Sequence, residues 1–390
     1  MDPAAFLTRN AVDALPAGEL EKKLALDRPL RVKLGVDPTS ADIHLGHAVV
    51  LTKLREFQDL GHKVVLIVGD YTARVGDPSG RSKTRPVVSG EQIDENARTY
   101  TEQAMTILRD DPALLEVRRN SEWLDMPMED LFRLARVATA AQILERDDFA
   151  KRFAAREPIS ILELLYPLLQ GYDSVAIRAD VELGGTDQKF NLLLGRDVQR
   201  AYGVKEQCVL TMPLLVGTDG VEKMSKSLGN YVGVTDGPPD MYGKTLSIPD
   251  DVIDTWTRLL GMELGDVASD AGPRERKRAL ARAVVRRFHG DGAAVAAEER
   301  FDTVFVRKDI PDDVEEHVLA LDTPDPVHLP ALIADVFGGS RSDARRLVQG
   351  GGVKLDGEAL PPGEMDVPLS RLDGVVLQAG KRRFRRLRSA

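Results

Sequence analysis

The fold is decided by residues 31–47, which read RVKLGVDPTSADIHLGH. Residues 31–36 are a short β-rich run, and a similar run, KVVLIV, follows at 63–68. Between the two runs, from about Leu45 to Leu60, apolar residues recur at helical spacing. A buried strand, a helix and a second buried strand predict a parallel sheet covered by helices. We expect two further strands, near 175–178 and 208–216.

Length and composition limit the kind of protein. A chain of 390 residues predicts two or three domains. It contains no apolar run of about 18 residues, the length of a membrane-spanning helix. Its first residues lack the basic and apolar layout of a secretory signal. The single cysteine, Cys208, excludes an internal disulfide and a cysteine-based zinc site. Together these features predict a cytoplasmic protein with no membrane partner.

Charge is distributed unevenly along the chain. The net charge is −9, but from Pro326 onward eleven Lys and Arg residues face seven Asp and Glu residues. That segment therefore carries +4, which leaves −13 for the remainder. An acidic body with a basic end is typical of a protein in which only one module contacts phosphates.

Two histidines, His44 and His47, stand where the first strand passes into the helix, with Gly46 between them. A helix start attracts phosphate, because it offers unpaired N–H groups and the positive end of the helix dipole. Imidazoles three residues apart lie on one helical face and can donate to the same anion. Gly46 lets a base or ribose lie against the backbone. Taken alone, the motif also fits two surface histidines, or a metal pair for which no third ligand lies nearby.

A second motif, Lys223-Met224-Ser225-Lys226-Ser227, lies in a segment bounded by glycines. Such flanks favour a mobile loop. Two lysines on that loop can close over a triphosphate and neutralise charge that develops in a transition state. An isolated pentapeptide of this kind also fits a solvated loop. Together the two motifs resemble the signatures of class I aminoacyl-tRNA synthetases, and the likeness spans the predicted nucleotide-binding fold.

This resemblance implies ATP as a substrate, Mg²⁺ with its triphosphate, no prosthetic group and no protein metal site. The hypothesis requires an imidazole cluster and an ammonium cluster, both taken as cationic, to converge on one nucleotide polyanion. The catalytic residues that it implies are His44, His47, Thr39, Lys223 and Lys226. The ATP-binding residues that it implies are Gly46, Gly185, Asp187, Met224, Ser225 and Lys226.

Three further segments look like motifs of tyrosyl-tRNA synthetases: GDPSG at 76–80, YPLLQGYD at 166–173 and GGTDQ at 184–188. The resemblance implies an enzyme that activates tyrosine with ATP and transfers it to the 3′-terminal ribose of tRNA(Tyr). It also implies contacts of Asp77, Tyr166 and Gln170 with the α-ammonium group, of Asp173 with the phenolic hydroxyl, and of Gln188 with the carboxylate. Gly185 and Asp187 bind ribose on this view, and Gly35 completes the tyrosine-binding set.

The chemistry of this set also stands without the family. Tyr166, Gln170 and Asp173 occupy positions i, i+4 and i+7, so one helix aims all three at one cleft. An ordinary helix face with a capping Asp is the alternative. A buried Asp173 needs a hydrogen-bond donor, and a phenol supplies one. Many family members carry a tyrosine where this chain has Lys33, so the second partner of the hydroxyl is left unassigned.

The end of the chain resembles an RNA-binding domain first seen in a small-subunit ribosomal protein, through residues 340–350 and 352–357. Clustered arginines bind RNA backbone and stack on bases. A solubilising basic tail is the alternative. The resemblance implies tRNA(Tyr) as a partner, bound by Arg341, Arg345, Arg346, Lys381 and Arg382.

The predicted fold class is α/β. A Rossmann-like parallel-sheet catalytic domain is followed by an α-helical domain and a small α+β RNA-binding domain. The bounds are 1–233 with a helical insertion at about 120–153, then 234–322 and 326–390. Family resemblance implies a homodimer formed through the inserted helices. The competing hypotheses are a tryptophanyl-tRNA synthetase, another nucleotidyltransferase, and an RNA-binding or splicing protein built on a synthetase scaffold.

Overall fold

A computed structural model describes residues 2–38, 42–77, 89–265, 267–268, 271–307, 310, 314–320, 323–380 and 383–389. The chain forms two compact units, the first made of 1–237 and 244–284 and the second of 238–243 and 285–390. The predicted division into three domains stays a prediction. In the described part of the chain, no helix is both long enough and apolar enough to cross a membrane.

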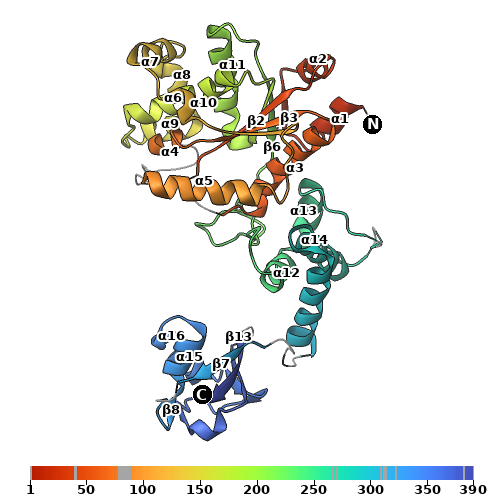
Figure 1. Ribbon diagram of the computed structural model, residues 1–390, viewed down its shortest axis with the longest axis vertical. Helices are drawn as coiled ribbons and strands as arrows, with labels where there is room; N and C mark the ends of the chain where they lie inside the picture. The colour runs from red at the N-terminus through yellow and green to blue at the C-terminus, as the bar shows by residue number, and fades with distance from the viewer. Residues whose placement is uncertain are drawn as a thin grey trace. The chain divides into compact units, whose positions relative to one another are not determined.

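The first unit is built on a six-stranded sheet with the order β1-β6-β5-β2-β3-β4 (Figure 1). Only β1 runs antiparallel to its neighbour, and the other pairs are parallel. The α/β fold class is therefore confirmed. The strands are β1 (Asp13–Leu15), β2 (Arg31–Val36), β3 (Lys63–Val68), β4 (Leu115–Arg119), β5 (Val181–Gly185) and β6 (Cys208–Met212).

The two runs that decide the fold form β2 and β3 over their predicted ranges, and the helix between them is α3 (Leu45–Asp59). The strand predicted near 175–178 is wrong, because that apolar run ends a helix. The Ile177 side chain is buried against Val65 and Ile67 of β3. A buried apolar residue alone does not distinguish a strand from the end of a helix. The strand predicted at 208–216 ends at Met212, since Pro213 cannot donate to the sheet.

Helices cover both faces of this sheet. Figure 1 shows α3 and α5 on one side and α10 and α11 on the other, as right-handed crossovers require. The predicted insertion contains four short helices between β4 and α10. The helices that lie wholly in the first unit are α1 (Pro3–Thr8), α2 (Glu19–Leu24), α3, α4 (Thr72–Val75), α5 (Gly90–Ala104), α6 (Ser121–Leu124), α7 (Met128–Ala135), α8 (Ala140–Leu144), α9 (Asp147–Ala154), α10 (Ile161–Ala176), α11 (Lys189–Ala201) and α13 (Ile253–Leu259).

The second unit contains a five-stranded sheet, with the order β10-β9-β12-β13-β7, and a two-stranded sheet, β11-β8. Helices α15 (Leu329–Phe337) and α16 (Arg341–Gln349) supply Leu329, Ile333 and Val348 to its apolar core. β7 pairs in parallel with β13, so this sheet includes a strand that precedes residue 326. The strands are β7 (Glu316–Leu319), β8 (Val327–His328), β9 (Val353–Leu355), β10 (Glu358–Ala359), β11 (Asp366–Val367), β12 (Val376–Ala379) and β13 (Arg383–Ser389).

Two helices contribute residues to both units, α12 (Pro238–Leu246) and α14 (Pro273–Phe301). α14 is interrupted at Gly290, where the backbone has φ 85° and ψ 170°. Its first segment begins at Pro273 and ends at this break. The short helical pieces of the chain are η1 (Thr186–Gln188), η2 (Asp250–Val252), η3 (Asp302–Arg307) and η4 (Leu369–Arg371).

The close contact between α10 and α11 depends on glycines. A Cβ atom at Gly171 of α10 would lie 2.8 Å from Cγ2 of Val198 and 3.3 Å from the Cα atom of Gly195, both on α11. Neither neighbour has a flexible end that can move away. Gly171 therefore sets the position of the helix on which Tyr166, Gln170 and Asp173 lie.

We predict that Gly171→Ala lowers the free energy of unfolding of the first unit by about 1–3 kcal/mol, the usual cost of overpacking a dense contact. The matched control is Gly90→Ala, because Gly90 is also helical, lies in the first unit, and a Cβ atom there meets nothing within 4 Å. That change should be neutral or stabilising, since alanine favours helix more than glycine. Thermal unfolding of both variants checks the prediction. Equal melting temperatures would contradict it.

Candidate functional site

The order in which the chain adds strands to the sheet of the first unit reverses at β2. β3 and β4 follow β2 on one side, whereas β5 and β6 continue on the other side. Loops leaving the carboxyl ends of β2 and β5 therefore separate and leave a crevice, the usual place for a ligand in an open α/β sheet. A cavity of about 380 Å³ lies there, lined by Gly35 at the end of β2 and by Gly185 at the end of β5.

Most of the residues predicted from the sequence line this one cavity. Its lining includes Gly35, His44, Gly46, His47, Asp77, Tyr166, Gln170, Asp173, Gly185, Asp187, Gln188, Lys223, Met224 and Ser225. Lys226 is not part of the lining, and its Nζ lies 2.7 Å from Oδ2 of Asp42. Arg341, Arg345 and Arg346 lie on α16 in the second unit. Thr39, Lys381 and Arg382 fall outside the described residues.

The two histidines hold each other and the start of α3 in place. His44 is the N-cap residue, and its Nδ1 accepts a hydrogen bond from the Gly46 backbone N–H at 3.1 Å. Nδ1 of His47 accepts from the His44 backbone N–H at 3.2 Å. The ring centroids are 4.0 Å apart. Because both Nδ1 atoms accept, the proton of each neutral ring lies on Nε2.

Both imidazoles are neutral at physiological pH. Burial lowers the pKa of His44 to about 2, and the nearby His47 and Lys226 add to the effect. Burial lowers the pKa of His47 to about 4, again with a contribution from Lys226. The expectation of a cationic imidazole cluster is therefore wrong. The histidines offer two Nε2–H donors, and the positive charge comes from the lysines.

The lysine motif lies on a loop that is ordered by Asn230. The side chain of Asn230 is buried, its Oδ1 accepts from the Ser225 N–H at 2.8 Å, and its Nδ2 donates to Oδ2 of Asp219 at 2.6 Å. Lys223 lies 3.4 Å from Oδ2 of Asp187, at the end of β5. Lys226 is close enough to the histidines to depress the pKa of both. The ammonium groups and the imidazoles therefore converge.

Three residues of α10, Tyr166, Gln170 and Asp173, line the same cavity. The Tyr166 hydroxyl donates to Oδ2 of Asp37 at 2.9 Å. Asp173 is 3% exposed, and its Oδ1 accepts from Nε1 of Trp123 at 2.8 Å. Burial raises the pKa of Asp173 to about 6, against the attraction of Lys33 and the Trp123 hydrogen bond. Its carboxylate is thus the charged form at neutral pH.

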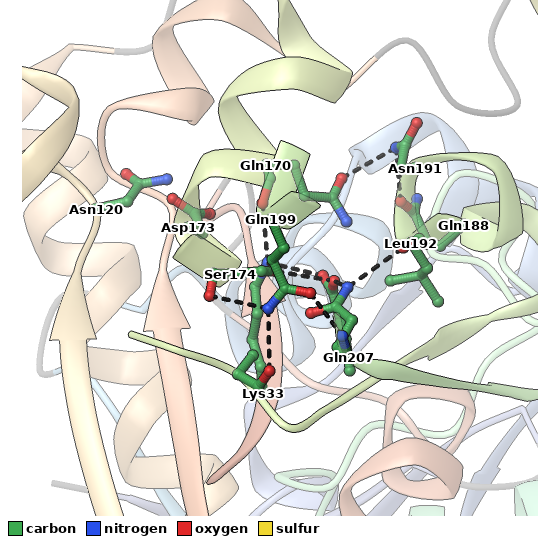
Figure 2. Close-up of polar contacts among 12 residues, drawn as sticks. Lys33, Asn120, Gln170, Asp173, Ser174, Gln188, Asn191, Leu192, Gln199 and Gln207 are labelled. Atoms are coloured by element: carbon green, nitrogen blue, oxygen red, sulfur yellow. Dashed lines mark hydrogen bonds and ion pairs between the residues drawn. The ribbon is translucent and has the colours of Figure 1, made fainter. Parts of the chain in front are cut away.

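An amide network joins this helix to α11, as Figure 2 shows. Nδ2 of Asn191 donates to Oε1 of Gln170 and to Oε1 of Gln188, each at 3.0 Å. Nε2 of Gln188 donates to Oδ2 of Asp77 at 3.0 Å. Nη1 of Arg146, from the inserted segment, donates to Oδ1 of Asn191 at 3.0 Å. Three predicted amino-acid contacts, Asp77, Gln170 and Gln188, are therefore held together by one residue.

Sequence reasoning missed Asp37, Trp123, Arg146 and Asn191. Asn191 lies on α11, three residues after its N-cap residue Gln188, so helical spacing could have identified it. Asp37 directly follows the first strand, and its position next to the predicted phosphate-binding helix start was the available signal. Trp123 and Arg146 carried no local signal, because they lie in the inserted segment and reach the site only through the tertiary fold.

In the described part of the chain, no group of three or more His, Cys, Asp or Glu side chains forms a metal site. The carboxylates of the cavity instead have protein partners. Asp37 accepts from Tyr166, Asp77 accepts from Gln188, and Asp187 lies beside Lys223.

Comparisons with known proteins agree with this geometry. A family model described as "tRNA synthetases class I (W and Y)" matches residues 25–306. The chain is 50% identical over 392 residues to the tyrosine–tRNA ligase of Thiobacillus denitrificans, with 98% of each chain covered. It is 50% identical over 394 residues to the tyrosine–tRNA ligase of Thermotoga maritima, covering 98% of this chain and 96% of that one.

Solved structures show the same fold. A C-terminally truncated mitochondrial tyrosyl-tRNA synthetase of Aspergillus nidulans superposes with a TM-score of 0.64 at 20% identity, covering 78% of this chain and 93% of that one. A tyrosyl-tRNA synthetase of Archaeoglobus fulgidus, complexed with L-tyrosine, gives 0.61 at 23% identity and covers 76% and 98%.

The burial of His44 and His47 generates a pH prediction. The unfolded chain binds protons on these rings below about pH 6.5, whereas folded His47 binds one only near pH 4. Stability should therefore fall as the pH drops through that window. The ¹⁵N shifts of both rings should show the Nε2–H tautomer at pH 7 and no titration above pH 5. A ring that titrates near pH 6.5 would contradict this.

Proposed function

This chain belongs to the class I tRNA synthetases of the tryptophan and tyrosine group, and we propose on that premise that it joins tyrosine to tRNA(Tyr) at the expense of ATP. One observation carries the proposal. A single cavity is lined both by the tyrosine-type set Tyr166, Gln170 and Asp173 and by the two histidines. An amino acid and a nucleotide bound there would meet in the middle.

Tyrosine would lie along α10. Asp173 would accept a hydrogen bond from the phenolic hydroxyl, because its buried carboxylate has acceptor capacity beyond the Trp123 contact. Asp77, Tyr166 and Gln170 would hold the ammonium group, and Gln188 would orient the carboxylate. The amide network through Asn191 fixes those groups before the substrate arrives.

ATP would lie across the start of α3. A Cβ atom at Gly46 would be 2.8 Å from Cε1 of His44, and one at Gly185 would be 2.7 Å from Oδ1 of Asp187. A side chain at either position would displace His44 or Asp187, where the nucleotide needs room. Met224 is buried beside Gly46 and would contact the base, while Asp187 would bind ribose.

The first step needs positioning and charge stabilisation but no general base, since the tyrosine carboxylate is already a nucleophile. Its oxygen forms a bond to the α-phosphorus, and the bond from that phosphorus to the bridging oxygen of pyrophosphate breaks. Nε2–H groups of His44 and His47 would donate to the phosphate oxygens as the transition state forms. Lys223 and Lys226 would neutralise the departing pyrophosphate, which Mg²⁺ accompanies as part of the substrate.

In the second step, a hydroxyl of the terminal ribose of tRNA attacks the adenylate carbonyl and AMP leaves. The tRNA would be bound in part by α16, on which Arg341, Arg345 and Arg346 are exposed. The roles of Thr39, Lys381 and Arg382 in ATP and tRNA binding remain part of the proposal. The proposal also places the reaction in the cytoplasm.

A homodimer is the assembly that we propose. The insertion and the start of α10 expose large apolar side chains, among them Met128 at 62%, Phe132 at 58%, Phe153 at 65% and Ile161 at 80%. Apolar groups gathered in this way are typical of a surface that binds a partner. A second copy of the chain would cover them.

The experiment that tests the proposed activity is ATP–pyrophosphate exchange with each standard amino acid in turn. Tyrosine should support exchange, and tryptophan and phenylalanine should not. Exchange with tryptophan alone would assign the chain to the other branch of its family. A chain that exchanges with no amino acid would refute the enzyme activity.

For tRNA binding, we predict that Arg341→Gln together with Arg345→Gln in the full chain weakens the affinity for tRNA(Tyr). The slope of log affinity against log salt should fall by about 1 for each phosphate that the variant no longer neutralises. Pyrophosphate exchange should be unchanged. Arg371→Gln is the control, because Arg371 pairs with Glu364 outside α16. Unchanged tRNA affinity in the double variant would contradict the assignment.

A further inference from the structure

A buried ion pair lies beneath α10, between Lys33 of β2 and Glu182 of β5. The two residues are direct partners in the register of these strands. Their side chains are 0% and 1% exposed, and Nζ lies 2.8 Å from Oε1. Taking two charges out of water is costly, so a pair of this kind is weak evidence for stability and invites another explanation.

The ammonium group of Lys33 makes two hydrogen bonds and one ion pair, all with protein groups. Besides the Glu182 contact, its Nζ donates to the Gln170 carbonyl at 2.9 Å and to Oγ of Ser174 at 2.8 Å. The ammonium group is fully buried, and Lys33 is not among the residues that line the cavity. Lys33 therefore does not replace the tyrosine that many relatives carry at this position as a direct partner of the phenol.

The pair instead ties α10 to the sheet. Ser174 accepts from Lys33 and donates to Oε2 of Glu182 at 3.1 Å, and Gln207 also donates to that oxygen. Figure 2 shows Lys33 below Gln170 and Ser174. Gln170 and Ser174 lie on the same turn of α10 as Asp173. This turn is therefore held on both sides of Asp173, the residue that would accept a hydrogen bond from the phenolic hydroxyl of tyrosine.

The surroundings of Asp173 give Lys33 a second effect. Lys33 from β2 attracts the carboxylate, and Glu182 from β5 repels it more weakly. Trp123 and Asn120 are neutral donors, and Tyr166 is a neutral neighbour on α10. The carboxylates of Asp37 and Asp77 also line the cavity. Burial raises the pKa of Asp173 to about 6 and so disfavours its charged form. Lys33 is the cation among these groups, and it favours the charged form.

We propose that the Lys33–Glu182 pair is a positioning device that holds Asp173 in place and in its ionised form, and so sets the discrimination between tyrosine and phenylalanine. This inference rests on the proposed function. Tyrosyl-tRNA synthetases are themselves the standard example of such discrimination, roughly 10⁵-fold against phenylalanine, because the polar group in the site is left unpaired without the hydroxyl. Lys33 acts on that choice through Asp173 and touches no substrate.

The test compares Lys33→Met/Glu182→Gln with the wild-type chain. The double change keeps side-chain volume and leaves no unpaired charge, a replacement that folded proteins usually tolerate. The matched control is Lys53→Met/Glu56→Gln, which removes another buried pair, at 2.5 Å, on α3. Pyrophosphate exchange is measured with tyrosine and with phenylalanine, and KM for tyrosine is followed from pH 5 to pH 8.5.

In the wild-type chain, KM for tyrosine should rise as the pH falls below about 6, where Asp173 gains a proton. In the Lys33→Met/Glu182→Gln variant that rise should begin at higher pH, and the ratio of kcat/KM for tyrosine over phenylalanine should fall by about tenfold or more. KM for ATP should be unchanged. The control should keep the wild-type ratio and pH profile.

A wild-type ratio and pH profile in the folded double variant would overturn the inference. Should that variant not fold, Lys33→Gln/Glu182→Gln takes its place, because it removes both charges and keeps a side chain that can form hydrogen bonds at each position. An unchanged ratio in Lys33→Gln/Glu182→Gln would likewise overturn it. Failure of the wild-type chain to use tyrosine at all refutes the proposed function instead, so the two failures are distinct.

Discussion

The whole site depends on the pairing of β2 with β3 on one side and β5 on the other. The chain places β3 and β4 on one side of β2 and β5 and β6 on the other side. The connections that leave the carboxyl ends of β2 and β5 therefore lie on opposite faces of the sheet and leave a crevice between them. Residues at the start of α3, which follows β2, and at the end of β5 line that crevice. α10 enters it from the opposite face, at a position set by the contact of Gly171 with α11.

Burial then divides the chemistry between two kinds of group. His44 and His47 lose their positive charge to desolvation and keep one directed donor each. The loop lysines stay nearer to solvent and carry the charge, with Lys226 26% exposed and Lys223 48% exposed. Rigid neutral donors can align with a phosphate that changes geometry, while long lysine side chains that are partly exposed can neutralise a departing pyrophosphate. In the same cavity, Asp173 keeps its charge although it is buried, with Lys33 beneath it.

The sequence was sufficient for the parts of the site that rest on local pattern. Residues 31–36 and 63–68 are strands as expected, since both are short runs rich in Val, Leu or Ile. The spacing of Tyr166, Gln170 and Asp173 indicated a shared helix face, and all three line one cavity. The strand near 175–178 was not predictable, because Ile177 is equally apolar at the end of a helix. Trp123, Arg146 and the pairing of Lys33 with Glu182 depend on the register and on inserted helices, which no local pattern encodes.

The central claim is that imidazole donors and loop ammonium groups act on one nucleotide polyanion. Single-turnover formation of tyrosyl-adenylate by Lys226→Ala, measured beside the equilibrium affinity for tyrosine, tests it most directly. Removing one charged group that stabilises the transition state should slow this step by about a hundredfold or more and leave the affinity for tyrosine unchanged. A normal rate of adenylate formation in this variant would contradict the account.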